Sequence, residues 1–170
     1  RMERILSDVL KTTKLPHSQP TLCDLHALVD EVISLLSFST EERAIEVRCQ
    51  YAERHAMVFA DPVLLRQALH NIVSNSIQAQ PNGGMIEFRT QLDPESIQLT
   101  ISDAGPGVEP SRLTEIFKPF YTTKTDGTGL GLFLTKRIIN SFNAQITPIL
   151  PDTGGLRFVI AFPSGQDREE

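Results

Sequence analysis

The sequence lacks several features that mark large classes of proteins. It contains no cluster of lysine and arginine, and its formal net charge at pH 7 is -5. Because binding to a phosphate backbone needs clustered cations, nucleic acid is not an expected partner. It also lacks a signal peptide and any apolar run near the ~20 residues that cross a bilayer. We therefore expect a cytoplasmic location for this part of the protein, and membrane anchoring of the full-length protein stays open.

Cysteine is scarce as well. Cys23 and Cys49 are isolated and lack the spacing of a metal site. We expect both to be free thiols in a reducing compartment, where cysteine packs as a small apolar group. A disulfide between them is the alternative.

The chain is long enough for one compact core, because 40% of its 170 residues are hydrophobic. Residues 1–15 carry one helical stripe of apolar residues and contain no partner for it. They predict the end of a longer helix from another module, and a helix folded back on this domain is the alternative. We expect a helix end and linker in residues 1–20, one globular domain in 21–164 and a frayed tail in 165–170.

Hydrophobic periodicity and cap residues predict the elements of the globular part. The predicted helices are 24–36, 61–78 and 129–142, with a helical turn within 110–116, and the predicted strands are 45–51, 85–92, 97–103, 145–150 and 156–162. Residues 57–60 predict a short strand beside 45–51. The segment 117–127 has no sustained period, which is typical of a lid or a disordered loop.

One carboxylate is predicted to point into the core. Ile97, Leu99 and Ile101 share a face of their strand, and Asp103 continues the same parity. Burying a carboxylate without a donor costs free energy, so Asp103 needs a hydrogen-bonding partner. It could accept from an exocyclic amine such as adenine N6, while Gly105 and Gly107 let a flat ring approach the backbone. An ordinary turn after a strand is the alternative.

Side-chain amides line one face of the helix 61–78. Gln67, Asn71, Asn75 and Gln78 follow at steps of four, four and three residues. Asparagine is a poor residue for a helix interior, so the pair Asn71 and Asn75 needs an explanation. Their neutral oxygens suit a Mg²⁺ ion that also binds phosphates. A solvent-exposed face is the alternative.

A glycine cluster opens the helix 129–142. Gly127, Gly129 and Gly131 precede or begin it, and the free N–H groups of a helix N-terminus favour phosphate oxygens. The run has neither the dinucleotide-binding spacing nor the Lys-Ser/Thr ending of a P-loop. A plain loop before a helix is the alternative.

Together these motifs resemble the N, G1, F, G2 and G3 boxes of sensor histidine kinases. The matching segments are Asn71-x-x-x-Asn75, Asp103-Ala-Gly-Pro-Gly107, Phe117-Lys-Pro-Phe120, Gly127-Thr-Gly-Leu-Gly-Leu132 and Gly154-Gly155. The resemblance covers about residues 21–163. It implies the catalytic ATP-binding domain of that family, an α+β fold in which helices and a mixed sheet form a two-layer α/β sandwich. This Bergerat-type fold is shared with gyrase B, MutL and Hsp90-type ATPases, the GHKL superfamily.

The resemblance also implies roles for residues. Asp103 would bind adenine, and Asn75 would hold Mg²⁺ with Asn71 beside it. Lys124, in a lid formed by 118–126, would contact phosphate, so the implied catalytic residues are Asn71, Asn75 and Lys124. The implied ATP-binding set is Asn71, Asn75, Asp103, Gly105, Gly107, Phe117, Phe120, Lys124, Gly127, Thr128, Gly129, Leu130, Gly131 and Leu132.

The chain departs from many members of the family at three positions. Gln78 stands where a phosphate-contacting lysine is frequent, which places more of that role on Lys124. Asn143 and Ala144 replace glycines that often follow the helix 129–142. We expect these two changes to affect the local backbone and to leave the pocket intact.

The expected function is transfer of the γ-phosphoryl group of Mg-ATP to a histidine, for relay to an aspartate of a response-regulator receiver domain. The chain contains His17, His26, His55 and His70. His17 lies between prolines, and His26 and His70 lie in predicted helices without the acidic neighbour that follows the family's acceptor. We interpret all four as ordinary histidines and expect the acceptor before Arg1, on a dimerisation domain. The fragment is expected to be monomeric and the full-length protein a homodimer. A same-fold ATPase and a degenerate nucleotide-binding interaction module are the alternatives.

Overall fold

The computed structural model describes residues 18–124 and 127–164. The predictions for residues 1–15 and for the tail 165–170 lie outside this part. In chain order the elements are β1 (Thr21–Asp24), α2 (Leu25–Leu35), α3 (Ser37–Glu42), β2 (Ile45–Gln50), β3 (Met57–Ala60), α4 (Pro62–Gln78), β4 (Gly84–Leu92), β5 (Ser96–Asp103), the 3-10 turn η1 (Pro110–Arg112), α5 (Gly131–Ser141), β6 (Gln145–Ile149) and β7 (Arg157–Pro163).

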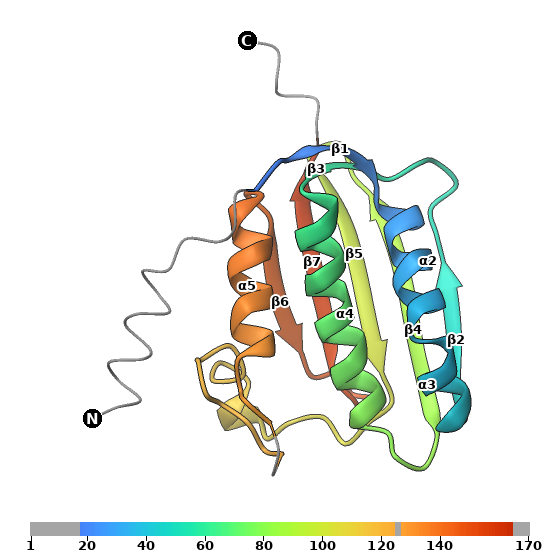
Figure 1. Ribbon diagram of the computed structural model, residues 1–170, viewed down its shortest axis with the longest axis vertical. Helices are drawn as coiled ribbons and strands as arrows, with labels where there is room; N and C mark the ends of the chain where they lie inside the picture. The colour runs from blue at the N-terminus through green and yellow to red at the C-terminus, as the bar shows by residue number, and fades with distance from the viewer. Residues whose placement is uncertain (1–17, 125–126, 165–170) are drawn as a thin grey trace.

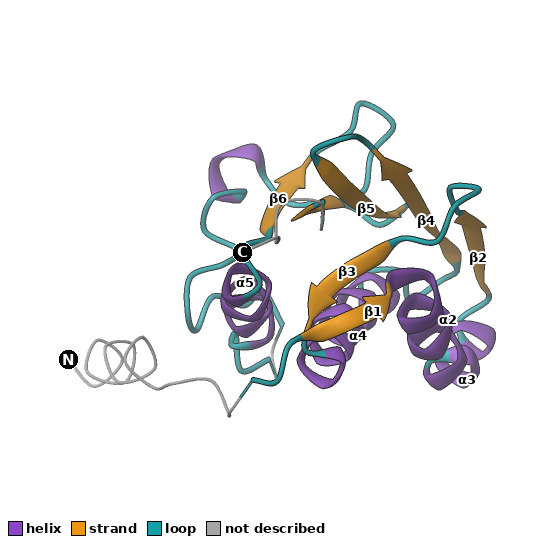
Figure 2. Ribbon diagram, turned by 90° about the horizontal axis from the view of Figure 1, so that it is seen from above, coloured by secondary structure: helices purple, strands orange, loops and turns teal. Residues whose placement is uncertain are grey.

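The main sheet has five strands in the order β2-β4-β5-β7-β6. β2 and β4 are parallel, and every other neighbouring pair is antiparallel, so the sheet is mixed. Helices α2, α4 and α5 lie side by side over one face of this sheet (Figures 1 and 2). The predicted α+β fold, with helices in one layer and a mixed sheet in the other, is confirmed.

The core lies between the two layers. Alternate residues of β5 are buried, including Leu99 and Ile101, and the register places Leu99 opposite the buried Ile160 of β7. From the helical layer, Leu65 and Ile72 of α4 are fully buried. Each such side chain contributes about 1.5–3 kcal/mol on burial, so this interface fixes how α4 lies on the sheet.

Two aspartates begin the main helices, as the sequence predicted. Asp61 caps α4 by accepting hydrogen bonds from the N–H groups of Val63 and Leu64 at 2.9 and 3.1 Å. Its other oxygen accepts from the N–H of Gln19 at 2.7 Å. Asp24 caps α2 in a similar way. The segment that enters the domain is thereby bound directly to the start of α4.

Three details differ from the sequence-based prediction. The strand Met57–Ala60 does not lie beside β2, because it pairs antiparallel with β1, which was not predicted. The helical region after Leu36 continues into α3. The last predicted helix begins at Gly131 and not at Gly129, because Gly129 has φ of 66° and cannot join a right-handed helix.

The two edges of the sheet have different sequences. On β2 the polar residues Glu46, Arg48 and Gln50 are exposed, with Glu46 and Arg48 paired at 2.7 Å. On the other edge, β6 is short and contains Pro148. Among the helices of residues 18–124 and 127–164, none has the length and apolar character needed to cross a membrane.

Candidate functional site

Asp103 is held at the end of β5 by three donors. It is only 8% exposed, which confirms the predicted burial. One carboxylate oxygen, Oδ1, accepts from the N–H groups of Gly105 at 3.0 Å and Leu156 at 3.2 Å. The other, Oδ2, accepts from the hydroxyl of Ser76 at 3.0 Å. The hydrogen-bonding partners that a buried carboxylate requires are therefore present before any ligand arrives.

Two polar residues that support this carboxylate were not singled out from the sequence. Ser76 comes from α4, and Gln80 follows the end of that helix. The Gln80 side chain accepts from the N–H groups of Met85 at 2.9 Å and Ala104 at 3.2 Å, and donates to the carbonyl of Ser76 at 3.1 Å. One signal was available for Ser76, since it interrupts the buried apolar stripe of α4. Nothing in the local sequence marks Gln80.

Glycines allow two loops to meet behind Asp103. A Cβ on Gly155 would lie 1.8 Å from the backbone oxygen of Asp103, and a Cβ on Gly107 would lie 2.8 Å from the oxygen of Gly155. Both glycines also have positive φ, at 80° and 69°. Only glycine satisfies both conditions, so the segments after β5 and before β7 pack backbone against backbone.

The predicted amides of α4 face the start of α5 and the lid. The side-chain amide of Asn71 donates to the carbonyl of Gly131 at 3.4 Å, a long contact that nevertheless places α4 against the glycine-rich segment. Asn75 and Gln78 lie one and two turns further along α4. The structure therefore brings the paired asparagines and the glycine cluster together, although they are distant in sequence.

Lys124 reaches from the lid to these amides. Its ammonium donates to Asn75 Oδ1 at 2.9 Å and also to Gln78 Oε1. Lys124 is an exposed residue, but partial desolvation of its ammonium lowers the pKa of Lys124 below its ordinary value. Two neutral amide oxygens thus converge on one positive charge.

A backbone contact joins Phe120 to Gly129, on either side of most of the predicted lid. The N–H of Phe120 donates to the carbonyl of Gly129 at 3.0 Å. Phe120 has φ of 66°, an uncommon value for a residue with a side chain, and Gly129 has the same φ. A Cβ on Gly129 would come within 2.4 Å of the Phe120 backbone, so this crossing point also requires glycine. Of the predicted lid, residues 125 and 126 lie outside the described part.

Phe117 packs in the core. It is 8% exposed and makes an edge-to-face contact with Phe158, with ring centroids 6.1 Å apart. The ammonium of Lys136 lies 5.0 Å from the centre of its ring. Phe117 therefore anchors the segment that precedes the predicted lid.

The N-terminus of α5 is capped differently from those of α2 and α4. Leu130 occupies the cap position and offers no side-chain acceptor to the first turn. Just before it, Thr128 Oγ1 accepts from the N–H of Leu130 at a long 3.4 Å. The first N–H groups of a helix that lacks such a cap can bind an anion, and the helix dipole favours one there.

Groups of three or more histidine, cysteine, aspartate or glutamate side chains that could bind a metal do not occur among the described residues. Three of the four histidines lie in the described part, and none of these three belongs to such a group. His26 contacts Thr90 Oγ1 at 2.8 Å, His55 contacts Asp24 at 2.9 Å, and His70 is exposed on α4. The fourth lies outside the described part. None of the three contacts the Asp103 or Lys124 groups.

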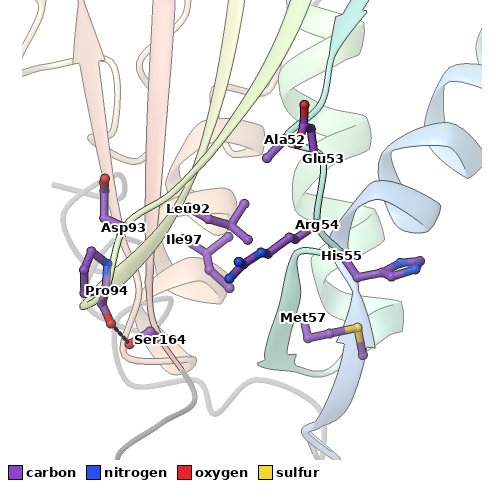
Figure 3. Close-up of a pocket in the computed structure, with 10 residues that line it drawn as sticks. All are labelled: Ala52, Glu53, Arg54, His55, Met57, Leu92, Asp93, Pro94, Ile97 and Ser164. Atoms are coloured by element: carbon purple, nitrogen blue, oxygen red, sulfur yellow. Dashed lines mark hydrogen bonds between the residues drawn. The ribbon is translucent and has the colours of Figure 1, made fainter.

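A cavity of about 610 Å³ lies at the start of β5, at the end of this strand opposite to Asp103 (Figure 3). Arg54, Met57, Leu92 and Ile97 are among the residues that line it. Ile97 is near the start of β5 and Asp103 is at its end, so the two places are roughly 20 Å apart. The residues predicted for nucleotide binding do not line this cavity.

Comparison with known proteins agrees with the geometry. Residues 60–166 match the family described as histidine kinase-, DNA gyrase B-, and HSP90-like ATPase. Sensor histidine kinase ZraS of Escherichia coli strain K12 is 29% identical over 170 residues, which are 100% of this chain and 37% of ZraS. Sporulation kinase A of Bacillus subtilis strain 168 is 32% identical over 164 residues, 96% of this chain and 27% of the kinase.

Among solved structures, the catalytic domain of histidine kinase ThkA has a TM-score of 0.78 at 28% identity, covering 85% of this chain and 95% of that domain. The chain spans about a third of the length of the curated relatives, at 37% and 27%. The segment matched by the family model, 60–166, includes α4, β4, β5, α5, β6 and β7 and contains both Asn75 and Asp103. This chain belongs to the family of histidine kinase-, DNA gyrase B- and HSP90-like ATPases.

Proposed function

We propose that this chain is the catalytic domain of a sensor histidine kinase. It binds Mg-ATP and transfers the γ-phosphoryl group to a histidine on a dimerisation domain, and this acceptor histidine is not one of the four in the chain. The observation that carries the proposal is the convergence on α4: Ser76 holds the buried Asp103, and Asn75 faces the lid lysine, Lys124. Helix α4 thus contacts both Asp103, which is suited to bind a nucleobase, and Lys124, which is suited to bind phosphates.

Asp103 is the proposed adenine-binding residue. Its carboxylate is buried and already accepts three hydrogen bonds, so it does not need to reorganise to accept one more from an exocyclic amine. Such an acceptor in an enclosed position discriminates strongly, because a ligand without the donor leaves the remaining acceptor position of the carboxylate unpaired.

Asn75 is the proposed Mg²⁺ ligand, with Asn71 beside it. The fit is supported by the way Asn75 Oδ1 and Gln78 Oε1 already accept a cation, the ammonium of Lys124. Mg²⁺ commonly takes few protein ligands and keeps phosphate and water oxygens. When bound, the ion would neutralise charge on the phosphates during transfer.

The phosphates are proposed to lie at the start of α5. Its first turn lacks a side-chain cap, and the glycine-rich segment 127–132 passes next to Asn71. Lys124 then supplies a point charge from the lid. These groups orient and bind the transferring group, and phosphoryl transfer depends chiefly on such positioning.

Kinase activity is favoured over free ATP hydrolysis by Asn71. In ATPases with the same fold a glutamate one turn before the metal-binding asparagine activates water, and here that position is Asn71. An amide cannot act as a general base, so water is not activated from this position. The degenerate interaction module is disfavoured by the intact Asp103 and Asn75 groups.

The proposed organisation of the chain follows from this function. Residues 1–20 are the end of a dimerisation helix and a linker, 21–164 the catalytic domain, and 165–170 a tail. The partners are the chain's own phosphoacceptor domain and a response-regulator receiver domain. We propose that the fragment is monomeric and that the full-length protein is a homodimer.

Calorimetric titration with Mg-ATP, with phosphate release followed in the same sample, tests the proposal. The parent protein is expected to bind ATP saturably and to release phosphate negligibly. Asp103→Asn should weaken binding at least ~100-fold, because an amide N–H₂ would face donors that now point at a carboxylate. Asp93→Asn, the same change near the other end of the sheet, should bind like the parent.

Steady phosphate release would favour the ATPase, and no binding by the parent would favour the degenerate module. Equal binding by Asp103→Asn and the parent would remove the adenine assignment while leaving nucleotide binding intact.

A further inference from the structure

We infer that Ser76 is the residue that restricts the site to nucleotides whose base carries an amino group where adenine does. It acts as a positioning residue, through Asp103. The inference rests on the proposed function, in which Asp103 faces the base.

The hydrogen bonds of Asp103 leave little room for a ligand. An ionised carboxylate has about four acceptor positions, two on each oxygen. Oδ1 uses two of them, for the N–H groups of Gly105 and Leu156. Oδ2 uses one for the hydroxyl of Ser76. One position remains, on Oδ2, and it can serve one donor.

Ser76 also determines whether a ligand meets hydrogen-bond donors or acceptors at this place. A hydroxyl has a single proton, and Ser76 donates it to Asp103 at 3.0 Å. Its remaining capacity is as an acceptor, so Ser76 and Asp103 together have no proton to give. A base with an amino group can bind such a pair, whereas a carbonyl at the same place meets only lone pairs.

The surroundings hold the backbone of Ser76 close to the end of β5. It is 3% exposed, and its carbonyl accepts from the buried Gln80 side chain at 3.1 Å. Gln80 in turn binds the N–H of Ala104, the residue after Asp103, at 3.2 Å. Helix α4 and the end of β5 are thereby joined twice, once through each side chain. The distance between Ser76 and Asp103 is therefore fixed before a nucleotide binds.

Removing the hydroxyl should weaken this selectivity. In Ser76→Ala, Oδ2 has two open positions, and a water molecule can fill one of them. Unlike the serine hydroxyl, that water can rotate and donate its second proton to a ligand carbonyl. The variant would then accept a base with a carbonyl more readily than the parent does.

The test compares ATP with inosine triphosphate, which carries a carbonyl in place of the amino group. Calorimetric titration should show that the parent prefers ATP. Ser76→Ala should lower the affinity for ATP about three- to tenfold and leave the affinity for inosine triphosphate unchanged or higher. The ratio of the ATP affinity to the inosine triphosphate affinity should therefore fall roughly tenfold. A general structural defect would lower both affinities and leave the ratio unchanged.

Two further variants complete the design. Ser74→Ala makes the same change on the same helix, where Ser74 contacts His70 at 3.5 Å, and should keep the parental ratio. Ser76→Cys replaces the hydroxyl by a somewhat larger thiol that is a weaker donor. It should give an intermediate ratio, and it decides the question if the alanine variant does not fold.

An unchanged ratio in a folded Ser76 variant would overturn the inference alone, because the parent would still bind ATP selectively as proposed. Failure of the parent to bind either nucleotide would overturn both this inference and the proposed function.

Discussion

The two ends of the proposed nucleotide site are built in different ways. At the base end, Asp103, Ser76 and Gln80 are 8%, 3% and 3% exposed, and their hydrogen bonds are to one another or to backbone groups of α4, β4 and the loops beside β5 and β7. At the phosphate end, Lys124 extends from a segment without regular structure and contacts only exposed or partly buried side chains. The base end is complete without ligand, whereas the phosphate end has to change its contacts.

That exchange of contacts centres on Asn75. Its Oδ1 accepts the Lys124 ammonium in the structure and is also the proposed ligand of Mg²⁺. Mg²⁺ and the Lys124 ammonium would repel each other if both were bound to this one oxygen. Binding of the metal is therefore linked to release of Lys124. We therefore expect changes at the base end to affect all adenine compounds and changes at the phosphate end to affect only those with phosphates.

Gly155→Ala should produce the largest effect. Its Cβ would fall 1.8 Å from the Asp103 backbone oxygen, so the loop would have to move and take the N–H of Leu156 away from Asp103. We expect a loss of about 3 kcal/mol or more in the free energy of unfolding, together with loss of adenosine binding. Urea denaturation and calorimetry measure the two quantities.

Gly154→Ala is the matched control for this change. Gly154 has φ of 86°, but nothing lies within 4 Å of the position of a Cβ. We expect only the backbone strain of about 1–2 kcal/mol and normal adenosine binding. Similar losses for the two variants would show that the loop behind Asp103 is not packed as described.

Lys124→Met should produce an intermediate effect confined to the phosphate end. We expect about a tenfold loss of ATP affinity, since one charge-assisted contact to phosphate disappears, and unchanged binding of adenosine. Lys118→Met is the control, because Lys118 pairs with Glu115 at 2.6 Å away from the amides. If Lys124→Met weakened adenosine and ATP equally, the division into two ends would be wrong.

The smallest effect concerns pH and the lid. Desolvation lowers the pKa of Lys124 below 10.5 when the lid contacts α4. Between the lowered pKa and 10.5 the open lid binds more protons than the closed one, so raising the pH through this window favours closure. Cleavage of the ligand-free protein after aromatic residues near 120 should slow as the pH rises. Lys124→Met should not share this dependence, and a faster cleavage of the parent at higher pH would contradict the sign.

Much of the framework was predictable because it depends on local periodicity. The strands around Leu99 and Phe158 alternate, and Asp61-Pro62 marks the start of α4. The inward direction of Asp103 followed from strand parity alone. Asn143, two residues after the end of α5, has φ of 56°, a left-handed conformation that asparagine tolerates. In each case the physical cause acts within a few residues of the chain.

The remaining features depend on contacts between distant segments. The four residues of β1 are too few to show a period, and their pairing with β3 spans more than 30 positions. Gln80 has no local signal, since its three hydrogen bonds are to backbone groups in α4, β4 and the loop after β5. Ser76 could have been found, because a hydroxyl in an otherwise apolar stripe requires a partner.

The edge strands β2 and β6 affect whether two copies of the domain pair through their sheets. An exposed sheet edge can recruit a second chain through its backbone groups, and the risk rises with local concentration. The opposite charges of Glu46 and Arg48 on β2 and the proline at 148 in the short β6 disfavour such pairing. In a homodimer of the full-length protein, as proposed, two domains would be held close for the lifetime of the molecule. Their sheets can then stay separate, and each domain remains free to approach and leave its phosphoacceptor.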